Sequence, residues 1–294
     1  MDPYKALADS IGGQLMSRVH YNTGYRLIQS AVKLLIDDKA EAISASELVW
    51  VDSGELLGRS AVQKIGALGP RTVLFNADDP TGKRDGARFD SLVAALPFYD
   101  LCVTVRDETM REFQALGANA IKSWRGCDEV VHAPPDADEI ERAGYPGGIT
   151  FVGTWIRGEN RDKILHDLIK AGLPVTIWGD RWSRSKYWPV LRQAWKGGGL
   201  RDRNYTLAIA SADACLGFLS KGNRDQHTRR SLEAPYIGSV LIAERTPEHQ
   251  EMFVEGEEAL FWDGPEECIS ACLKILNDKA ERDNMRAEIG RAHV

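Results

Sequence analysis

The chain has 294 residues, and 43% of them are apolar, so it is long enough for two domains with their own cores. Its net charge of −6 and its pI near 5.6 argue against a dedicated nucleic-acid-binding protein. Five cysteines without a C-x-x-C pair argue against zinc and suit a reducing cytosol, so we expect a cytoplasmic protein. No apolar run approaches the roughly 20 residues that span a bilayer.

Residues 1–47 are expected to be mostly helical. The polar, aromatic stretch 18–26 includes His20, and it suits either the lining of a cleft or a packed helix end. Strands predicted at 48–52, 72–76 and 101–105 then alternate with helices at 58–68, 87–96 and 108–116, which indicates a parallel, doubly wound sheet. Asp78 and Asp79 follow the second strand, at the edge where such sheets bind ligands, and are candidates for a catalytic carboxylate.

Residues 117–148 are rich in Pro, Gly and Asp and are expected to form an interdomain linker. We therefore place an amino-terminal domain at 1–143 and a carboxyl-terminal domain at 144–294. In the second domain, strands are predicted at 149–154, 174–179, 214–219, 239–243 and 259–263. Helices are predicted at 160–171, 205–212, 226–237 and 265–276, with a last one towards the end.

A cluster of cations stands out between the strands at 214–219 and 239–243. Lys221, Arg224, Arg229 and Arg230 lie within ten positions, with His227 among them. They fall at a predicted helix N-terminus, where the helix dipole disfavours cations, so a bound phosphate or diphosphate is expected there. Glu233, further along the same helix, is positioned to accept hydrogen bonds from ribose hydroxyls. A solvated basic helix face with a Glu–Arg pair is the alternative.

Several common catalytic motifs are absent. The sequence has no G-x-G-x-x-G after a strand and no P-loop, which weakens dinucleotide oxidoreductase and nucleotide triphosphatase interpretations. It also lacks the H-E-x-x-H metalloprotease motif and the G-x-S-x-G nucleophile elbow.

The part of the chain from Phe151 to Ala292 resembles the donor domain of CgeB-type, spore-maturation-like glycosyltransferases, which are similar to retaining GT-B fold enzymes. The pieces that carry the resemblance are FVGTW (151–155), IWGD (177–180), LSKGNRD (219–225), HTRRSLE (227–233), ERTPEH (244–249) and FWD (261–263). The amino-terminal half matches more weakly, through VWVD (49–52) and FNADDP (75–80).

The resemblance implies an α/β fold of two Rossmann-like domains that face each other across a cleft. It implies transfer of a sugar from a nucleotide diphosphate sugar, with retention, to an unknown acceptor held mainly by the first domain. Glu233 would hold the ribose. Lys221 with Arg224 or Arg229 would hold the diphosphate, supported by His227 and Arg230, while the backbone at Gly153, Thr154 and Gly179 would approach the donor.

In this scheme Lys221 and Arg229 stabilise the leaving diphosphate, so we expect no metal and no cofactor beside the donor substrate. Asp78, Asp79 or, with less support, His20 would act on the acceptor side, where a glycan, a lipid-linked molecule or a protein would bind. The sequence also departs from the resemblance at its start. Either the first βα unit of the amino-terminal domain is missing from this chain, or the fold has lost it. A non-catalytic nucleotide-sugar-binding or assembly protein, and a nucleotide-sugar epimerase, are therefore alternatives.

Overall fold

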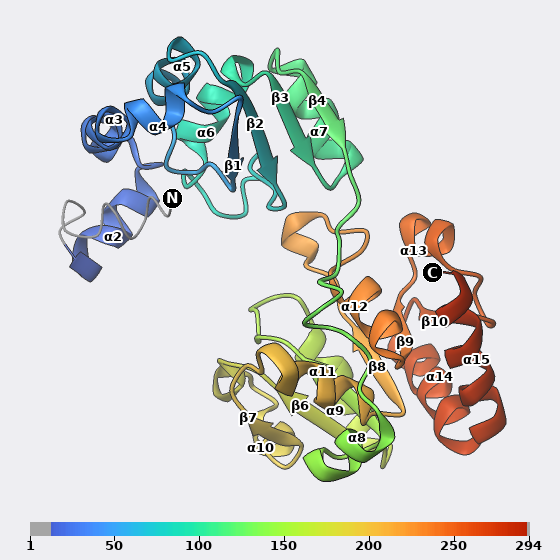
Figure 1. Cartoon of the computed structure of the whole chain (residues 1–294). Helices are drawn as coiled ribbons and strands as arrows, with labels where there is room; N and C mark the ends of the chain where they lie inside the picture. The colour runs from blue at the N-terminus through green and yellow to red at the C-terminus, as the bar shows by residue number, and fades with distance from the viewer. Residues whose placement is uncertain (1–12, 293–294) are drawn as a thin grey trace. The chain divides into compact units, whose positions relative to one another are not determined.

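The structure, a computed structural model, describes residues 13–292. The chain divides into two compact units, each built around one parallel sheet (Figure 1). Unit 1 comprises Met1–Trp124 with Gly222–Arg224, and unit 2 comprises Arg125–Lys221 with Asp225–Val294. The predicted domain boundary between residues 143 and 144 stays a prediction.

Unit 1 begins with helices and continues as a β/α alternation, as the sequence predicted. Its helices are α2 (Gly13–Asn22), η1 (Arg26–Ile28), α3 (Gln29–Asp38), α4 (Ala40–Ser44), α5 (Arg59–Ala67), α6 (Asp90–Ala95), η2 (Leu96–Phe98) and α7 (Asp107–Ala115). Its strands are β1 (Leu48–Asp52), β2 (Arg71–Asn76), β3 (Leu101–Thr104) and β4 (Ala120–Lys122), paired in parallel in that order.

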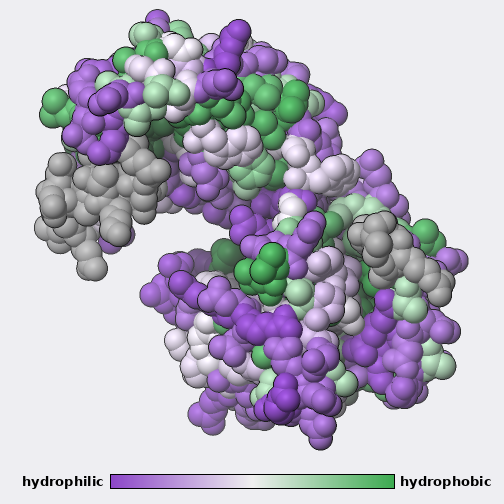
Figure 2. Space-filling model, viewed as in Figure 1, coloured by the Kyte–Doolittle hydropathy of each residue, from purple (hydrophilic) through white to green (hydrophobic). Residues whose placement is uncertain are grey.

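The described helices of unit 1 cover one face of its sheet, whereas the alternation of strands and helices had predicted a doubly wound sheet, with helices on both faces. Right-handed crossovers between successive neighbours place α5, α6 and α7 on the same face. The core on that face joins strand residues such as Leu74 to Val62, Leu92 and Phe113 of the three helices. On the opposite face Trp50 is 57% exposed (Figure 2 shows hydrophobic residues over these strands).

Unit 2 carries the longer sheet. Its strands are β5 (Ile149–Val152), β6 (Val175–Trp178), β7 (Trp195–Gly197), β8 (Ala214–Gly217), β9 (Val240–Glu244) and β10 (Ala259–Trp262). Its helices are α8 (Ala137–Ala143), α9 (Arg161–Lys170), η3 (Trp182–Arg184), α10 (Trp188–Leu191), α11 (Asp202–Ala210), α12 (Arg230–Ile237), α13 (Pro247–Met252), α14 (Pro265–Asn277) and α15 (Lys279–Ala292). The short turn η4 (Lys221–Asn223) follows β8.

The sheet of unit 2 is doubly wound, with the strand order β10-β9-β8-β5-β6-β7. One face packs against α9 and α14, with Leu165, Leu168 and Ile275 fully buried. The other packs against α11 and α12 through Ile209 and Ala234. The chain proceeds outward in one direction from β5 and in the other from β8, so the strand order reverses between these two strands. In open α/β sheets the ligand binds at the carboxyl end of such a switch point.

Three differences from the predicted elements matter for the site. Residues 117–148, predicted as a linker, contain the edge strand β4 and the helix α8, which is capped by the side chain of Asp136. The short strand β7 was not predicted. The helix predicted from Gln226 begins only at Arg230, so the residues before it form a loop. None of the described helices is both long enough and apolar enough to cross a membrane.

Candidate functional site at the switch point of unit 2

The backbone of two loops meets closely at the carboxyl ends of β5 and β6. Gly153 N donates to Trp178 O at 2.8 Å, and Trp155 N donates to Asp180 O at 3.0 Å. Gly179 has φ +137°, and a Cβ there would lie 2.1 Å from Gly153 O. Glycine is therefore required at 179, because any side chain would displace the loop that carries Gly153 and Thr154. These three predicted donor-binding residues do lie together.

A buried ion pair connects the loops that follow β5 and β8. Arg161, the first residue of α9, pairs with Glu159 and also donates to Thr154 O at 3.0 Å and to Leu219 O at 3.2 Å. Glu159 accepts from the hydroxyl of Ser220 at 2.9 Å. Removing one partner of such a pair leaves a buried charge uncompensated, so the pair fixes both loops of the switch point.

Glu233 lies in the first turn of α12 and is buried, with one oxygen engaged. Its Oε2 accepts from the hydroxyl of Tyr205 and from Arg230 Nη1, the latter at 2.9 Å. Arg230 also donates to Val152 O at 2.5 Å and lies over the Tyr205 ring, 4.8 Å from its centroid. Burial lowers the pKa of Arg230 from its usual value. Arg230 is thus engaged by protein groups, and it orients the carboxylate of Glu233.

The other oxygen of Glu233 faces His132. His132 Nδ1 accepts from Asp128 N at 3.1 Å, so in the neutral imidazole the proton is on Nε2. His132 Nε2 lies 3.9 Å from Glu233 Oε1, which is longer than a hydrogen bond. The His132 ring also packs edge-on against Tyr205 at 5.7 Å. Glu233 therefore has one oxygen fixed by protein donors and one beside an imidazole N–H donor.

Two of the predicted anion ligands are exposed cations. Lys221 has a side chain that is 57% exposed, and its Nζ is 3.2 Å from Glu244 Oε2. Glu244 Oε1 accepts from Leu219 N at 3.0 Å, so this carboxylate holds the loop after β8. Arg229 is the exposed N-cap residue of α12. Both charges are accessible to an anionic ligand.

His227 is buried, in contrast to these cations. Its Nδ1 lies 2.5 Å from Glu248 Oε2, and both side chains are almost fully covered. A second histidine, His249, lies nearby in α13 with Nδ1 2.7 Å from Glu244 O and Nε2 2.7 Å from the hydroxyl of Ser231. A carbonyl oxygen only accepts, so Nδ1 of His249 carries the proton and Nε2 accepts from Ser231. Burial lowers the pKa of His249. These contacts attach α12 to α13.

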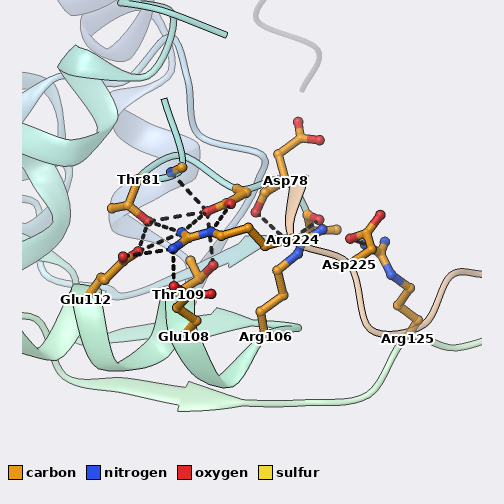
Figure 3. A network of polar contacts seen from close by, with 12 residues as sticks. Asp78, Thr81, Arg106, Glu108, Thr109, Glu112, Arg125, Arg224 and Asp225 are labelled. Carbon is orange, nitrogen blue, oxygen red and sulfur yellow. Dashed lines mark hydrogen bonds and ion pairs between the residues drawn. The ribbon is translucent and has the colours of Figure 1, made fainter. Parts of the chain in front are cut away.

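Arg224 belongs to unit 1 and is surrounded by carboxylates (Figure 3). It makes two 2.6 Å hydrogen bonds to Asp79, two to Glu112 at 2.8 and 2.9 Å, and an ion pair to Glu108 at 2.7 Å. Asp79, fully covered, also accepts from Thr109 and from Gly82 N, each at 3.2 Å. Burial alone would raise the pKa of Asp79, but the hydrogen bonds and charge of Arg224 outweigh burial and lower it.

Asp78 lies beside a second polar cluster at the carboxyl edge of the sheet of unit 1. Its side chain is 37% exposed and lies 3.6 Å from Arg88 Nη1. Arg88 also pairs with the buried Glu55, whose pKa is raised by burial, and lies 3.6 Å from Asp85. His20, the remaining acceptor-side candidate, is buried in α2, and its Nδ1 has no hydrogen-bond partner within residues 13–292.

The predicted basic cluster is thus divided in the structure. Lys221 and Arg229 are exposed, Arg230 orients Glu233, and Arg224 is bound by three carboxylates of unit 1. All four were expected around one anion because they are close along the chain, with a Glu–Arg pair on the helix as the alternative. Arg230 and Glu233 do form such a pair. The sequence had no signal for the acids of unit 1 that bind Arg224. Glu159, which pairs with Arg161, and Tyr205, which donates to Glu233, were also not singled out. The position of Arg161 at the start of the first helix after β5 was the available signal.

Comparisons with known proteins bear on the fold and on the carboxyl-terminal part of the chain. Residues 161–294 match a protein family described as glycosyl transferase-like. No curated protein gives a significant match to the sequence.

Solved structures resemble the chain along most of its length. A complex of Anabaena HepE with UDP and glucose superimposes with a TM-score of 0.66 at 13% identity, over 98% of this chain and 89% of that one. The sucrose-phosphate synthase of Thermosynechococcus elongatus gives 0.67 at 13%, over 91% and 73%. The trehalose 6-phosphate synthase of Burkholderia multivorans gives 0.62 at 13%, over 90% and 71%. The chain therefore has an α/β fold of the GT-B type, with two Rossmann-like units, and its carboxyl-terminal part is similar to glycosyltransferases.

Proposed function

We propose that the protein transfers a sugar from a nucleotide diphosphate sugar to an acceptor, with retention at the anomeric carbon and without a metal ion. The similarity of residues 161–294 to glycosyl transferase-like proteins supports a transferase. The likeness of the fold to HepE, which was solved with UDP and glucose, supports a nucleotide sugar as donor. The acceptor class stays open between a glycan, a lipid-linked molecule and a protein.

The observation that carries the proposal is the state of Glu233. Tyr205 and Arg230 orient one carboxylate oxygen. The other oxygen lies 3.9 Å from His132 Nε2, which is too far for a hydrogen bond. A ribose presents neighbouring hydroxyl groups, which donate hydrogen bonds to such an oxygen. A buried carboxylate that keeps an unused acceptor costs desolvation free energy, which a ligand hydroxyl would recover.

The diphosphate is proposed to lie against the loops after β5 and β8. Lys221 and Arg229 would neutralise it. Gly153 and Thr154 would present backbone, because Gly179 allows the loop after β6 to lie close to the loop after β5. Preorganised cations stabilise the charge that develops on a leaving diphosphate, and deleting one such group costs on the order of 10²–10³ in rate. His227 would then have a positioning role for the loop before α12, since its ring is paired with Glu248 of α13. Arg224, in contrast, is bound to carboxylates of unit 1.

On the acceptor side, Asp78 is the better candidate for a carboxylate that contacts substrate. It is partly exposed at the end of β2, whereas Asp79 has no exposed surface and both of its oxygens bind Arg224. A carboxylate with a lowered pKa and two guanidinium hydrogen bonds is a weak proton acceptor, so Asp79 would have a positioning role.

Ligand binding by the Glu233→Gln variant tests the site. We expect wild-type protein to be stabilised by nucleoside diphosphates, by roughly 2.7 kcal/mol at a hundred times the dissociation constant. In Glu233→Gln this stabilisation should fall, whereas the effect of pyrophosphate should be nearly unchanged. Glu139→Gln, which alters an acid of α8 paired with Arg203, serves as the matched control. Equal losses for both ligands would remove the ribose role.

A second candidate function, a non-catalytic nucleotide-sugar-binding protein, is favoured by one observation. Asp79 is occupied by Arg224, so one of the two predicted acceptor-side carboxylates is not accessible. Incubation with single nucleotide sugars separates the candidates: slow release of free sugar supports a transferase, binding without turnover supports a binding protein, and a changed sugar on the nucleotide supports an epimerase. Turnover that vanishes in excess chelator would contradict the metal-free scheme.

A further inference from the structure

The segment from Arg181 to Arg201 in unit 2 is positively charged throughout. Over these 21 residues it has six cations and no acid: Arg181, Arg184, Lys186, Arg192, Lys196 and Arg201. In the whole chain 27% of residues are charged and acids outnumber bases, so a segment of this length would ordinarily carry both signs. A one-sided segment in an acidic protein indicates a surface for an anionic partner.

All six cations are exposed, and none has an ion-pair partner in the part of the chain that the structure describes. Arg184 lies in η3 and Lys196 in β7, and the other four cations lie in the turns that precede, join and follow η3, α10 and β7. The segment is at the edge of the sheet where β7 is the last strand (Figure 1). Asp162 contacts this segment, but its carboxylate accepts from Ser185 and from Trp155. Asp180 and Asp202 flank the segment without entering it.

Aromatic side chains lie among the cations. Trp188 and Trp195 pack edge to face at 5.7 Å, and Trp195 is 38% exposed while its Nε1 donates to Gly179 O at 2.9 Å. Lys186 Nζ lies 5.0 Å from the centre of the Tyr187 ring. Indole and phenol rings set between Lys and Arg are typical of surfaces at the interface of a bilayer, because the rings are amphipathic and the cations meet headgroup phosphates.

We propose that this edge of unit 2, residues 181–201, docks on the surface of a bilayer that contains anionic phospholipids. The packing of Trp188 against Trp195 favours a bilayer over a nucleic acid, because a single-stranded nucleic acid stacks its bases on free aromatic faces. The cations are also spread along two short elements and the turns around them, which suits a diffuse array of phosphates. This inference goes beyond the proposed sugar transfer and does not depend on it.

Sedimentation with vesicles tests the proposal with the full chain. We expect binding to phosphatidylcholine vesicles that contain phosphatidylserine and little binding to phosphatidylcholine alone, with a marked loss at high salt. Each cation at such a surface contributes roughly fivefold in partitioning, so Arg184→Gln with Lys186→Gln should reduce binding about 25-fold. Arg192→Gln with Lys196→Gln should do the same. Arg181 and Arg201 are left intact, because they border the loops of the candidate donor site.

The matched control removes the same charge elsewhere in unit 2. Arg142 and Lys170 are exposed and lie outside the segment, so Arg142→Gln with Lys170→Gln should bind vesicles like the wild type. An equal loss in this control would show a general charge effect and overturn the proposal. So would unchanged binding by both segment variants, equal binding to neutral vesicles, or binding to single-stranded RNA in the absence of vesicle binding. Unchanged thermal melting would show that every variant is folded.

Discussion

Asp79→Asn should destabilise unit 1 strongly, although the substitution is nearly isosteric. Asp79 has no exposed surface, and both of its oxygens accept 2.6 Å hydrogen bonds from Arg224. An asparagine keeps one acceptor and turns an NH₂ group towards a guanidinium, which is also a donor. Thr109 and Gly82 N donate to the same carboxylate, so the amide group cannot rotate without losing further contacts.

The magnitude follows from the geometry. Breaking a buried ion pair typically costs about 3–5 kcal/mol. Arg224 is one quarter exposed and keeps its contacts with Glu112 and Glu108, so the lower end of that range applies, about 3 kcal/mol. For a unit of this size the melting temperature should fall by about 10 °C.

Urea denaturation and calorimetry at several pH values measure this effect. The folded-state pKa of Asp79 lies below its ordinary value of about 3.9, so its contribution is present above that pH and is lost as the pH falls through the folded value. The gap between wild type and Asp79→Asn should therefore narrow under acid. Asp107→Asn, which alters a half-exposed carboxylate paired with Lys122, should cost less than about 1 kcal/mol. A loss as small as this control's for Asp79→Asn would refute the reasoning.

Three further measurements follow from the same structure. Arg161→Met should lower the free energy of unfolding by about 3–5 kcal/mol, because it leaves Glu159 buried without its cation. The double variant Arg161→Met with Glu159→Leu should be more stable than Arg161→Met alone. The reverse order in urea titrations would contradict the buried ion pair. Wild-type stability should decline as the pH falls below about 6.5. The reason is that His249 takes up a proton in the unfolded chain at a higher pH than in the folded one, where burial lowers its pKa. In His249→Gln the decline should be smaller, as measured by unfolding at several pH values. Leu74→Ala, on the packed face of the unit 1 sheet, should lower the free energy of unfolding by about 2–5 kcal/mol. Trp50→Ser, on the face that the described helices leave exposed, should lower it by less than about 1 kcal/mol. Comparable losses on thermal melting would indicate that the second face is covered.

Much of the fold could be predicted from local patterns. The apolar runs predicted as strands at 149–154 and 239–243 have the length and flanking turns of buried parallel strands. Both strands were confirmed, at 149–152 and 240–244. The short strands β4 and β7 were missed because three residues carry no periodicity. The coverage of the unit 1 sheet was predicted incorrectly, because the alternation of strands and helices is the same in singly and doubly wound sheets and only the strand order distinguishes them.

In the candidate site, too, some features could be predicted from the sequence and others could not. Glu233 was predicted from its place in a helix, and the glycines at 153 and 179 from the family resemblance. That these residues bind the donor stays a prediction. The partners of Arg224 could not be predicted, because the carboxylates that bind it are distant in sequence. Arg224 is 145 residues from Asp79 and 112 from Glu112. No local pattern contains such pairs.

The sequence by itself therefore determined most of the strands and helices, and which residues follow the longer strands at their carboxyl ends, since both depend on short-range periodicity and turn chemistry. Only the tertiary structure decided which cations stay accessible to a ligand and which are bound by carboxylates. The physical reason is that a charge is neutralised by its neighbours in space, and strand order sets those neighbours only when the sheet forms.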